Sequence, residues 1–119
     1  MNFQMFEINN QKIAKVMAEQ VVITNAQEAL DLIANAYYQE ATGIIIEERQ
    51  LDFSFFDLRS GLAGELLQKC ANYQMKLAVI GEFEKFKSES LQAFILECNR
   101  GRAVSFVADT ETAISKITS

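Results

Sequence analysis

The sequence predicts an α/β fold, and the stretch from Gly43 to Gly81 is the main reason. It contains an apolar strand at 43–47, a small-residue turn at 60–64, a helix, and a second apolar strand at 76–80. A strand–helix–strand unit of this length has to cross over and pair in parallel. The loop after the first strand therefore opens at the carboxyl edge of a sheet, which ligands and partners favour.

The amino-terminal part predicts a β-hairpin. Phe3, Met5 and Ile8 begin an extended segment, and 13–16 continues as a second one. The Asn9-Asn10 pair between them supplies a turn.

Amphipathic helices and one further strand account for the rest of the chain. After an apolar run at 21–23, Thr24 or Asn25 can cap a helix whose apolar residues recur at helical spacing up to Tyr37. The other expected elements are helices within 54–72, from Ser88 to Asn99 and from Thr110 to Lys116, and a strand at 103–107. Ser88 and Asp109 can cap the last two of these helices. We expect a mixed sheet with a parallel core, the antiparallel hairpin at its side, and about four helices.

Length and composition predict one soluble domain over residues 1–119. The chain is half apolar, lacks proline and shows no linker or repeat. The amino terminus has no basic start followed by an apolar segment, and the apolar runs are too short to cross a membrane. We therefore expect a cytoplasmic protein that makes no membrane contact.

The charge balance argues against nucleic acid as a partner. The chain has 16 acidic and 11 basic residues, a net charge of −5, and its basic residues are scattered. Nucleic-acid binders instead concentrate Lys and Arg along one face. Lys85 and Lys87 flank Phe86, but neighbouring glutamates offset their charge.

The absence of histidine excludes Ser-His and Cys-His catalytic pairs. Cys70 and Cys98 are not spaced for a zinc site, and both lie among apolar residues, so we interpret them as buried, inert thiols. No phosphate-binding or dinucleotide-binding glycine motif is present. We expect no cofactor and no catalytic activity.

A set of carboxylates near the first core strand raises an alternative. Gathered beyond a parallel strand, they could hold magnesium for phosphate chemistry. Their spacing matches no metal motif, so we favour ordinary surface acidity. The residues are Glu47, Glu48, Asp52, Asp57 and Glu65.

Ser60 admits two interpretations. If a helix begins there, its hydroxyl can cap the helix, and the amides of Gly61, Leu62 and Ala63 form a positive end suited to phosphate. The simpler interpretation, which we favour, has Ser54 cap a longer helix that contains Ser60. Gly61 then becomes a small position that allows close helix packing.

The aromatic residues Phe53, Phe55 and Phe56 cannot all point the same way on a helix or strand. An exposed ring near the carboxyl edge would contact a partner or an apolar ligand. Burial of all three rings under the loop is the alternative, which we slightly favour.

The order of elements resembles the STAS domain, the regulatory module of anti-sigma factor antagonists and of sulfate-transporter tails. The local match is Asp57-Leu58-Arg59-Ser60-Gly61-Leu62, which looks like that family's Asp-Ser-Ser-Gly-Leu turn. Arg59 departs from the family's first serine. The resemblance implies a STAS-like sandwich in which Ser60 is the phosphorylated serine, and an arginine beside it could pair with the phosphate.

The chain also resembles the bacterial domain-of-unknown-function family 4180. The similar stretches are 29–39 and 55–65, and the likeness covers roughly residues 20 to 117. We expect a regulatory or binding protein that contacts a protein partner through residues 52–64. A small-molecule binding domain or weak enzyme, acting on a nucleotide or phosphorylated ligand at the same edge, is the alternative. The surface allows a homodimer without requiring one.

Overall fold

Residues 2–119 are described by a computed structural model with an α/β fold. The strands are β1 (Phe3–Ile8), β2 (Gln11–Val16), β3 (Gly43–Glu47), β4 (Lys76–Ile80) and β5 (Val104–Val107). The α-helices are α1 (Ala26–Tyr38), α2 (Leu62–Asn72), α3 (Glu89–Arg100) and α4 (Thr110–Thr118). Three short 3-10 helices lie between β3 and α2: η1 (Glu48–Gln50), η2 (Phe53–Phe56) and η3 (Leu58–Ser60). In this part of the chain no helix has both the length and the apolar content to cross a membrane.

The five strands form one sheet in the order β1-β2-β3-β4-β5. β1 and β2 are antiparallel and are joined by a turn at Asn9 and Asn10, whose φ angles are 54° and 64°. Positive φ at both central positions is typical of the tight hairpin turn, and asparagine tolerates it well. The strands from β2 to β5 pair in parallel. The predicted mixed sheet with a parallel core and an amino-terminal hairpin is confirmed.

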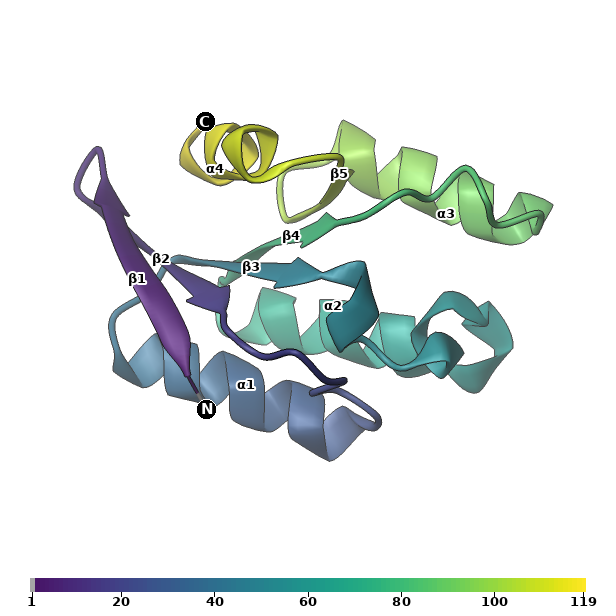
Figure 1. The fold of residues 1–119 in the computed structure, drawn as a ribbon, viewed down its shortest axis with the longest axis horizontal. Coiled ribbons are helices and arrows are strands. Elements are labelled where there is room, and N and C mark those ends of the chain that lie inside the picture. The colour runs from purple at the N-terminus through teal and green to yellow at the C-terminus, as the bar shows by residue number, and fades with distance from the viewer. Residues whose placement is uncertain (1) are drawn as a thin grey trace.

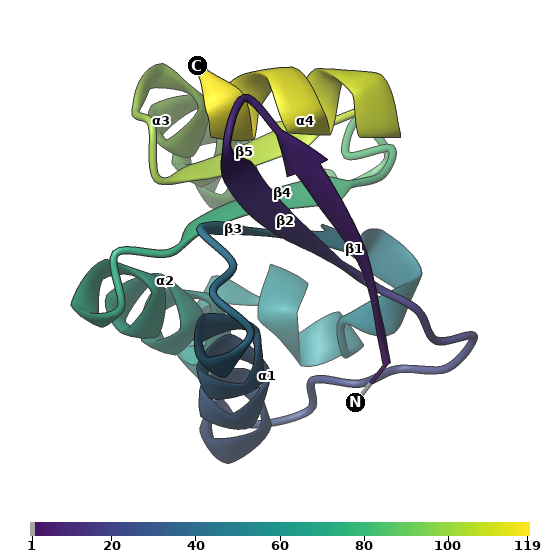
Figure 2. The same cartoon turned by 90° about the vertical axis from the view of Figure 1, so that its left-hand side faces the viewer.

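The sheet is covered unequally on its two faces. Its parallel strands follow one another in chain order, so right-handed crossovers place all the connecting helices on the same face. Buried residues of α1, α2 and α3 accordingly pack in one core with one face of the sheet, whereas α4 packs alone on the opposite face. Figures 1 and 2 show α4 above the sheet, with α1 and α2 below it.

β3 lies at the centre of both cores. Ile44 and Ile46 belong to the larger core with the α2 residue Leu66, whereas Ile45 belongs to the smaller core with the α4 residue Ile117. Successive side chains of a strand point to opposite faces, so a continuous apolar run is what a strand buried on both faces requires.

Three of the predicted helix starts are capped as expected. The side chains of Asn25, Ser88 and Asp109 accept hydrogen bonds from the amides of Glu28, Leu91 and Thr112, at 2.8, 3.1 and 2.7 Å. Each cap satisfies a backbone donor that has no partner within its own helix.

The favoured interpretation of residues 54–72 as one helix capped by Ser54 is wrong. The chain instead forms η2 and η3, and α2 begins only at Leu62. Gly61 separates η3 from α2 with a φ of 80°, a left-handed conformation that glycine adopts without steric cost. A continuous right-handed helix cannot pass through this position.

Candidate functional site

The loop between β3 and α2 lies beyond the carboxyl edge of the sheet, as predicted. β3 and β4 are parallel and end on the same side, where the loop and the start of α3 also lie (Figure 1). Because the parallel strands follow chain order, the sheet has no point at which the strand order reverses. The crevice that such a reversal usually creates is absent from residues 2–119, so the loop itself supplies the accessible surface.

Two aspartates shape this loop. The Asp52 carboxylate accepts a hydrogen bond of 3.0 Å from the amide of Ser54, and the Asp57 carboxylate accepts one of 3.1 Å from the amide of Arg59. Asp57 also accepts from Nε of Arg59 at 3.0 Å. The Arg59 side chain lowers the pKa of Asp57, and the hydrogen bonds from Ser54 lower the pKa of Asp52. Both carboxylates therefore keep their charge in mildly acidic solution.

Ser60 lies at the junction of η2, η3 and α2. Its hydroxyl donates to the backbone carbonyl of Ser54 at 2.6 Å and accepts from the amide of Leu62 at 3.2 Å. Ser60 is exposed, whereas Leu62 is buried. The helix therefore begins two residues beyond Ser60, and the serine oxygen reaches its first amide.

The three phenylalanines of η2 have different environments, so the expectation that all are buried is wrong. Phe53 is 78% exposed, whereas Phe55 and Phe56 are 0% and 6% exposed. In a 3-10 helix, residues three apart share a face, so Phe53 and Phe56 point to the same side. Phe55 and Phe56 both belong to the larger core, so Phe53 is the ring of the three that lies outside it.

Phe53 and Phe56 line a groove, here called the aromatic groove, of about 390 Å³. Its base is a stacked pair, Phe56 and Phe86, with ring centroids 4.7 Å apart and planes inclined by 14°. Lys85 Nζ lies 5.5 Å from the Phe86 ring centroid, within cation–π range. The groove is lined by Phe53, Phe56, Asp57, Leu58, Arg59, Phe86, Lys87, Ser88, Ser90 and Leu91.

The rim of the aromatic groove is polar and carries both signs of charge. The Arg59 side chain is 91% exposed, and Lys87 is also exposed. Asp57, beside Arg59, is the acidic member of the lining. An apolar base within a charged rim is the usual composition of a surface that contacts another protein.

The acidic residues from the sequence do not converge on one point. Glu47 pairs with Arg49, Glu65 pairs with Lys69, and Asp52 and Asp57 cap the loop turns. Within residues 2–119 no group of three His, Cys, Asp or Glu side chains could hold a metal ion.

Glu48 has a different role from the other carboxylates. It forms an ion pair with Lys85 and accepts a hydrogen bond of 3.2 Å from the amide of Glu82. Its side chain is only 18% exposed. Glu48 therefore fastens the chain after β4 to the end of β3, which places Phe86 near Phe56.

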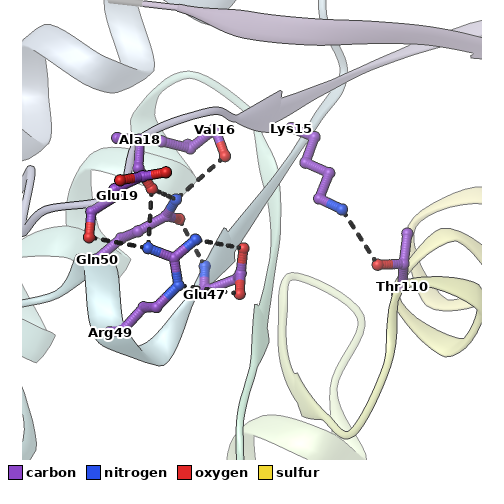
Figure 3. Close-up of polar contacts among 8 residues, drawn as sticks. All are labelled: Lys15, Val16, Ala18, Glu19, Glu47, Arg49, Gln50 and Thr110. Carbon is purple, nitrogen blue, oxygen red and sulfur yellow. Dashed lines mark hydrogen bonds and ion pairs between the residues drawn. The ribbon is translucent and has the colours of Figure 1, made fainter.

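A second polar cluster, shown in Figure 3, was missed by sequence reasoning. The fully buried Gln50 donates to the carbonyls of Val16 and Ala18 at 3.2 and 2.8 Å, and its side-chain oxygen accepts from the amide of Glu47 at 2.9 Å. Arg49 donates to the Ala18 carbonyl at 3.0 Å and pairs with Glu47. Gln50 stands three residues after Glu47, the place that Glu or Gln takes in a capping box, and this spacing is the signal that could have indicated the cluster. These hydrogen bonds join the residues around the end of β2 to the residues that follow β3. The cluster therefore holds the end of β2 against the end of β3.

The two cysteines are free and differ in environment. Cys70 is buried, and burial raises the pKa of its thiol to about 12. Cys98 is partly exposed, and burial together with the neighbouring Glu97 raises its pKa. The thiolate, which is the reactive form, is therefore scarce at both positions near neutral pH.

The protein is therefore an α/β domain with one sheet, whose strands lie in the order in which they occur in the chain. The aromatic groove lies beyond the carboxyl edge of this sheet. The chain belongs to the family described as Domain of unknown function (DUF4180), whose model matches residues 8–117. The resemblance to this family inferred from the sequence is thereby confirmed. A search of the curated proteins found no match to the chain.

Proposed function

We propose that this protein is a non-catalytic regulatory or binding protein that contacts a protein partner through residues 52–64. The observation that carries the proposal is Phe53, an aromatic ring 78% exposed at the edge of the aromatic groove. Exposed aromatic rings beside well-packed apolar surface are typical anchors of protein interfaces. A bacterial, cytoplasmic setting is part of the same proposal.

The resemblance of Asp57-Leu58-Arg59-Ser60-Gly61-Leu62 to the STAS turn supports a regulatory role for this loop. In STAS regulators the serine of the turn is phosphorylated by a partner kinase. Ser60 is exposed and precedes α2 by two residues, so a phosphate there would lie near the positive end of that helix.

We propose that phosphorylation of Ser60 changes how Phe53 is presented. The Ser60 hydroxyl proton is used in the bond to the carbonyl of Ser54, the residue after Phe53. A phosphate replaces that donor with oxygens that only accept, and it adds about −1.5 to −2 charges at neutral pH. The bond that holds η2 against η3 would then be lost.

Capture with three forms of the chain tests the partner role. Wild type, Phe53→Ala and Tyr38→Ala would each be immobilised, and bound proteins identified by mass spectrometry. Tyr38 is a matched control because its ring is 83% exposed and lies on α1, outside the aromatic groove. A protein retained by wild type and Tyr38→Ala but lost with Phe53→Ala supports the proposal. Equal recovery with all three forms contradicts it.

The alternative is a binding domain or weak enzyme for a nucleotide or other phosphorylated ligand. Two features of the aromatic groove support this alternative. The stacked rings of Phe56 and Phe86 could bind a planar ring of a ligand, and Arg59 and Lys87 could contact its phosphate. Thermal unfolding with a nucleotide panel separates the two proposals. If a nucleotide raises the Tm of wild type and does not raise that of Arg59→Ala, ligand binding is favoured as the primary role over contact with a protein partner.

A further inference from the structure

The two edge strands of the sheet, β5 and β1, differ in whether their outward-facing backbone groups have hydrogen-bond partners. At the β5 edge, the Asn99 side chain of α3 accepts a hydrogen bond from the Phe106 amide at 2.7 Å and donates one to the Phe106 carbonyl at 3.3 Å. The side-chain amide thus occupies the place of a neighbouring strand. β1 forms the opposite edge, and in Figures 1 and 2 no described segment of the chain lies along its outer side.

The register of the hairpin shows which β1 groups face outward. The amide of Met17 donates to the carbonyl of Asn2 at 2.9 Å, so these two residues form a hydrogen-bonded pair. Hydrogen-bonded and non-hydrogen-bonded pairs alternate along an antiparallel ladder. The N–H and C=O groups of Phe3, Met5 and Glu7 therefore point away from β2.

β1 lacks most of the features that usually protect an edge strand. Its six residues, FQMFEI, include no proline, lysine or arginine, and they pair with β2 without a bulge. Met5 is 37% exposed, and Phe3 and Phe6 are partly buried. Glu7 supplies the only charge, in a chain whose net charge is −5.

We infer that β1 is a dimerisation edge that pairs antiparallel with β1 of a second copy of this chain. A two-fold axis at Met5 places Met5 opposite Met5 of the second copy, and Phe3 opposite its Glu7. Every outward-facing N–H and C=O group of the three residues then has a partner. The two sheets become one continuous sheet, which is a common mode of strand addition.

The number of paired residues, together with charge, selects this register over its neighbours. An axis at Gln4 would leave Glu7 beyond the end of the other β1 strand, and an axis at Phe6 would leave Phe3 beyond it. An axis at Glu7 would place two carboxylates directly opposite each other, which is destabilising. An axis at Phe3 would leave Glu7 outside the paired region. With the axis at Met5, each Glu7 carboxylate is separated from the other by the intervening residues of both strands. This interface is independent of residues 52–64, so the two proposals can fail separately.

The mass in solution tests the inference. By sedimentation equilibrium from about 1 μM to about 1 mM, a span suited to a small interface, wild type should pass from 13.4 kDa to twice that mass. Met5→Lys and Met5→Glu should each remain at 13.4 kDa, because each places like charges across the axis. An equimolar mixture of the two variants should recover the dimer, because opposite charges then meet.

Leu96→Lys is the matched control, since Leu96 is 55% exposed and lies on α3, away from β1. It should dimerise as wild type does. Circular dichroism at low concentration checks that the Met5 variants are folded, which we expect because Met5 is 37% exposed in the single chain. A wild-type chain that stays at 13.4 kDa throughout overturns the inference. A Met5→Lys chain that dimerises as wild type does, or a mixture that stays monomeric, also overturns it.

Discussion

The hydroxyl of Ser60 donates a 2.6 Å hydrogen bond to the backbone carbonyl of Ser54. The same oxygen accepts from the amide of Leu62, so one side-chain atom joins η2 to the first residue of α2. The exposed ring of Phe53 precedes Ser54 directly. The position of the candidate contact residue Phe53 is therefore coupled to the serine whose phosphorylation we propose.

Replacing Ser60 with alanine should lower the free energy of unfolding by about 1 kcal/mol, because both hydrogen bonds of the hydroxyl are lost. Backbone amides of η2 should also exchange faster with solvent, as measured by NMR. Ser90→Ala is a suitable control, since Ser90 also lines the aromatic groove but lies within α3. Equal effects of the two substitutions would contradict the role assigned to Ser60.

The two glycines at the start of α2 should respond oppositely to alanine. Gly61 has a φ of 80°, and apart from its chain neighbours no residue comes within 4 Å of the position a Cβ would take, so the cost of Gly61→Ala is backbone strain of about 1–2 kcal/mol. Gly64 lies within α2 and also has free space around it. Gly64→Ala should therefore stabilise the protein by about 0.5–1 kcal/mol.

Urea denaturation of the two variants measures these changes. Both variants replace glycine with alanine, at positions three residues apart. Opposite changes in the free energy of unfolding must therefore come from the backbone conformation at each position. Stabilisation by Gly61→Ala would show that α2 starts earlier than Leu62.

Much of the fold could be predicted because its signals are local. The Asn9-Asn10 turn, the caps at Asn25, Ser88 and Asp109, and the apolar run of β3 each depend on a few neighbouring residues. Strand order does not follow from local signals, nor does the covering of one sheet face by α4 alone. Both result from packing between segments distant in the sequence.

The loop was harder to predict because two local signals compete there. Ser54 can cap a helix, but Asp52 and Asp57 each accept from the amide two residues on and close separate turns. The exposure of Phe53 depends on this choice, since a 3-10 helix and an α-helix direct the same side chains differently. The spacing of apolar residues in the sequence alone could not show that the Phe53 ring is exposed.

Asn99 should contribute to stability through the edge of β5. Asn99→Ala removes the partner of both the amide and the carbonyl of Phe106, a residue that is only 6% exposed. Leaving such groups without partners costs about 1–3 kcal/mol, which thermal unfolding would detect. The open edge should also increase aggregation on heating, as measured by light scattering.

Asn72→Ala is the control for this substitution. Asn72 is exposed at the end of α2, and its side chain accepts a single bond, from Gln68. Its replacement should change the free energy of unfolding by no more than about 0.5 kcal/mol. Similar losses in the two variants would contradict an edge-closing role for Asn99.

Asp109 should make the protein sensitive to acid. Its carboxylate caps α4, and the hydrogen bond from the Thr112 amide holds its pKa below the ordinary value of 3.8. The unfolded chain then binds the proton more readily than the folded chain. This contribution to stability is therefore present above pH 3.8 and is lost as the pH falls through the lower folded-state pKa. Asp52 and Asp57 act in the same direction.

Asp109→Asn isolates the contribution of Asp109, because asparagine also caps helices but does not titrate. Urea denaturation at about pH 6 and about pH 3 should show a smaller loss of stability for the variant than for wild type. The difference should be only partial, because Asp52 and Asp57 still titrate in both forms. An identical loss in the two forms would show that the Asp109 cap is equally strong when the carboxyl is protonated.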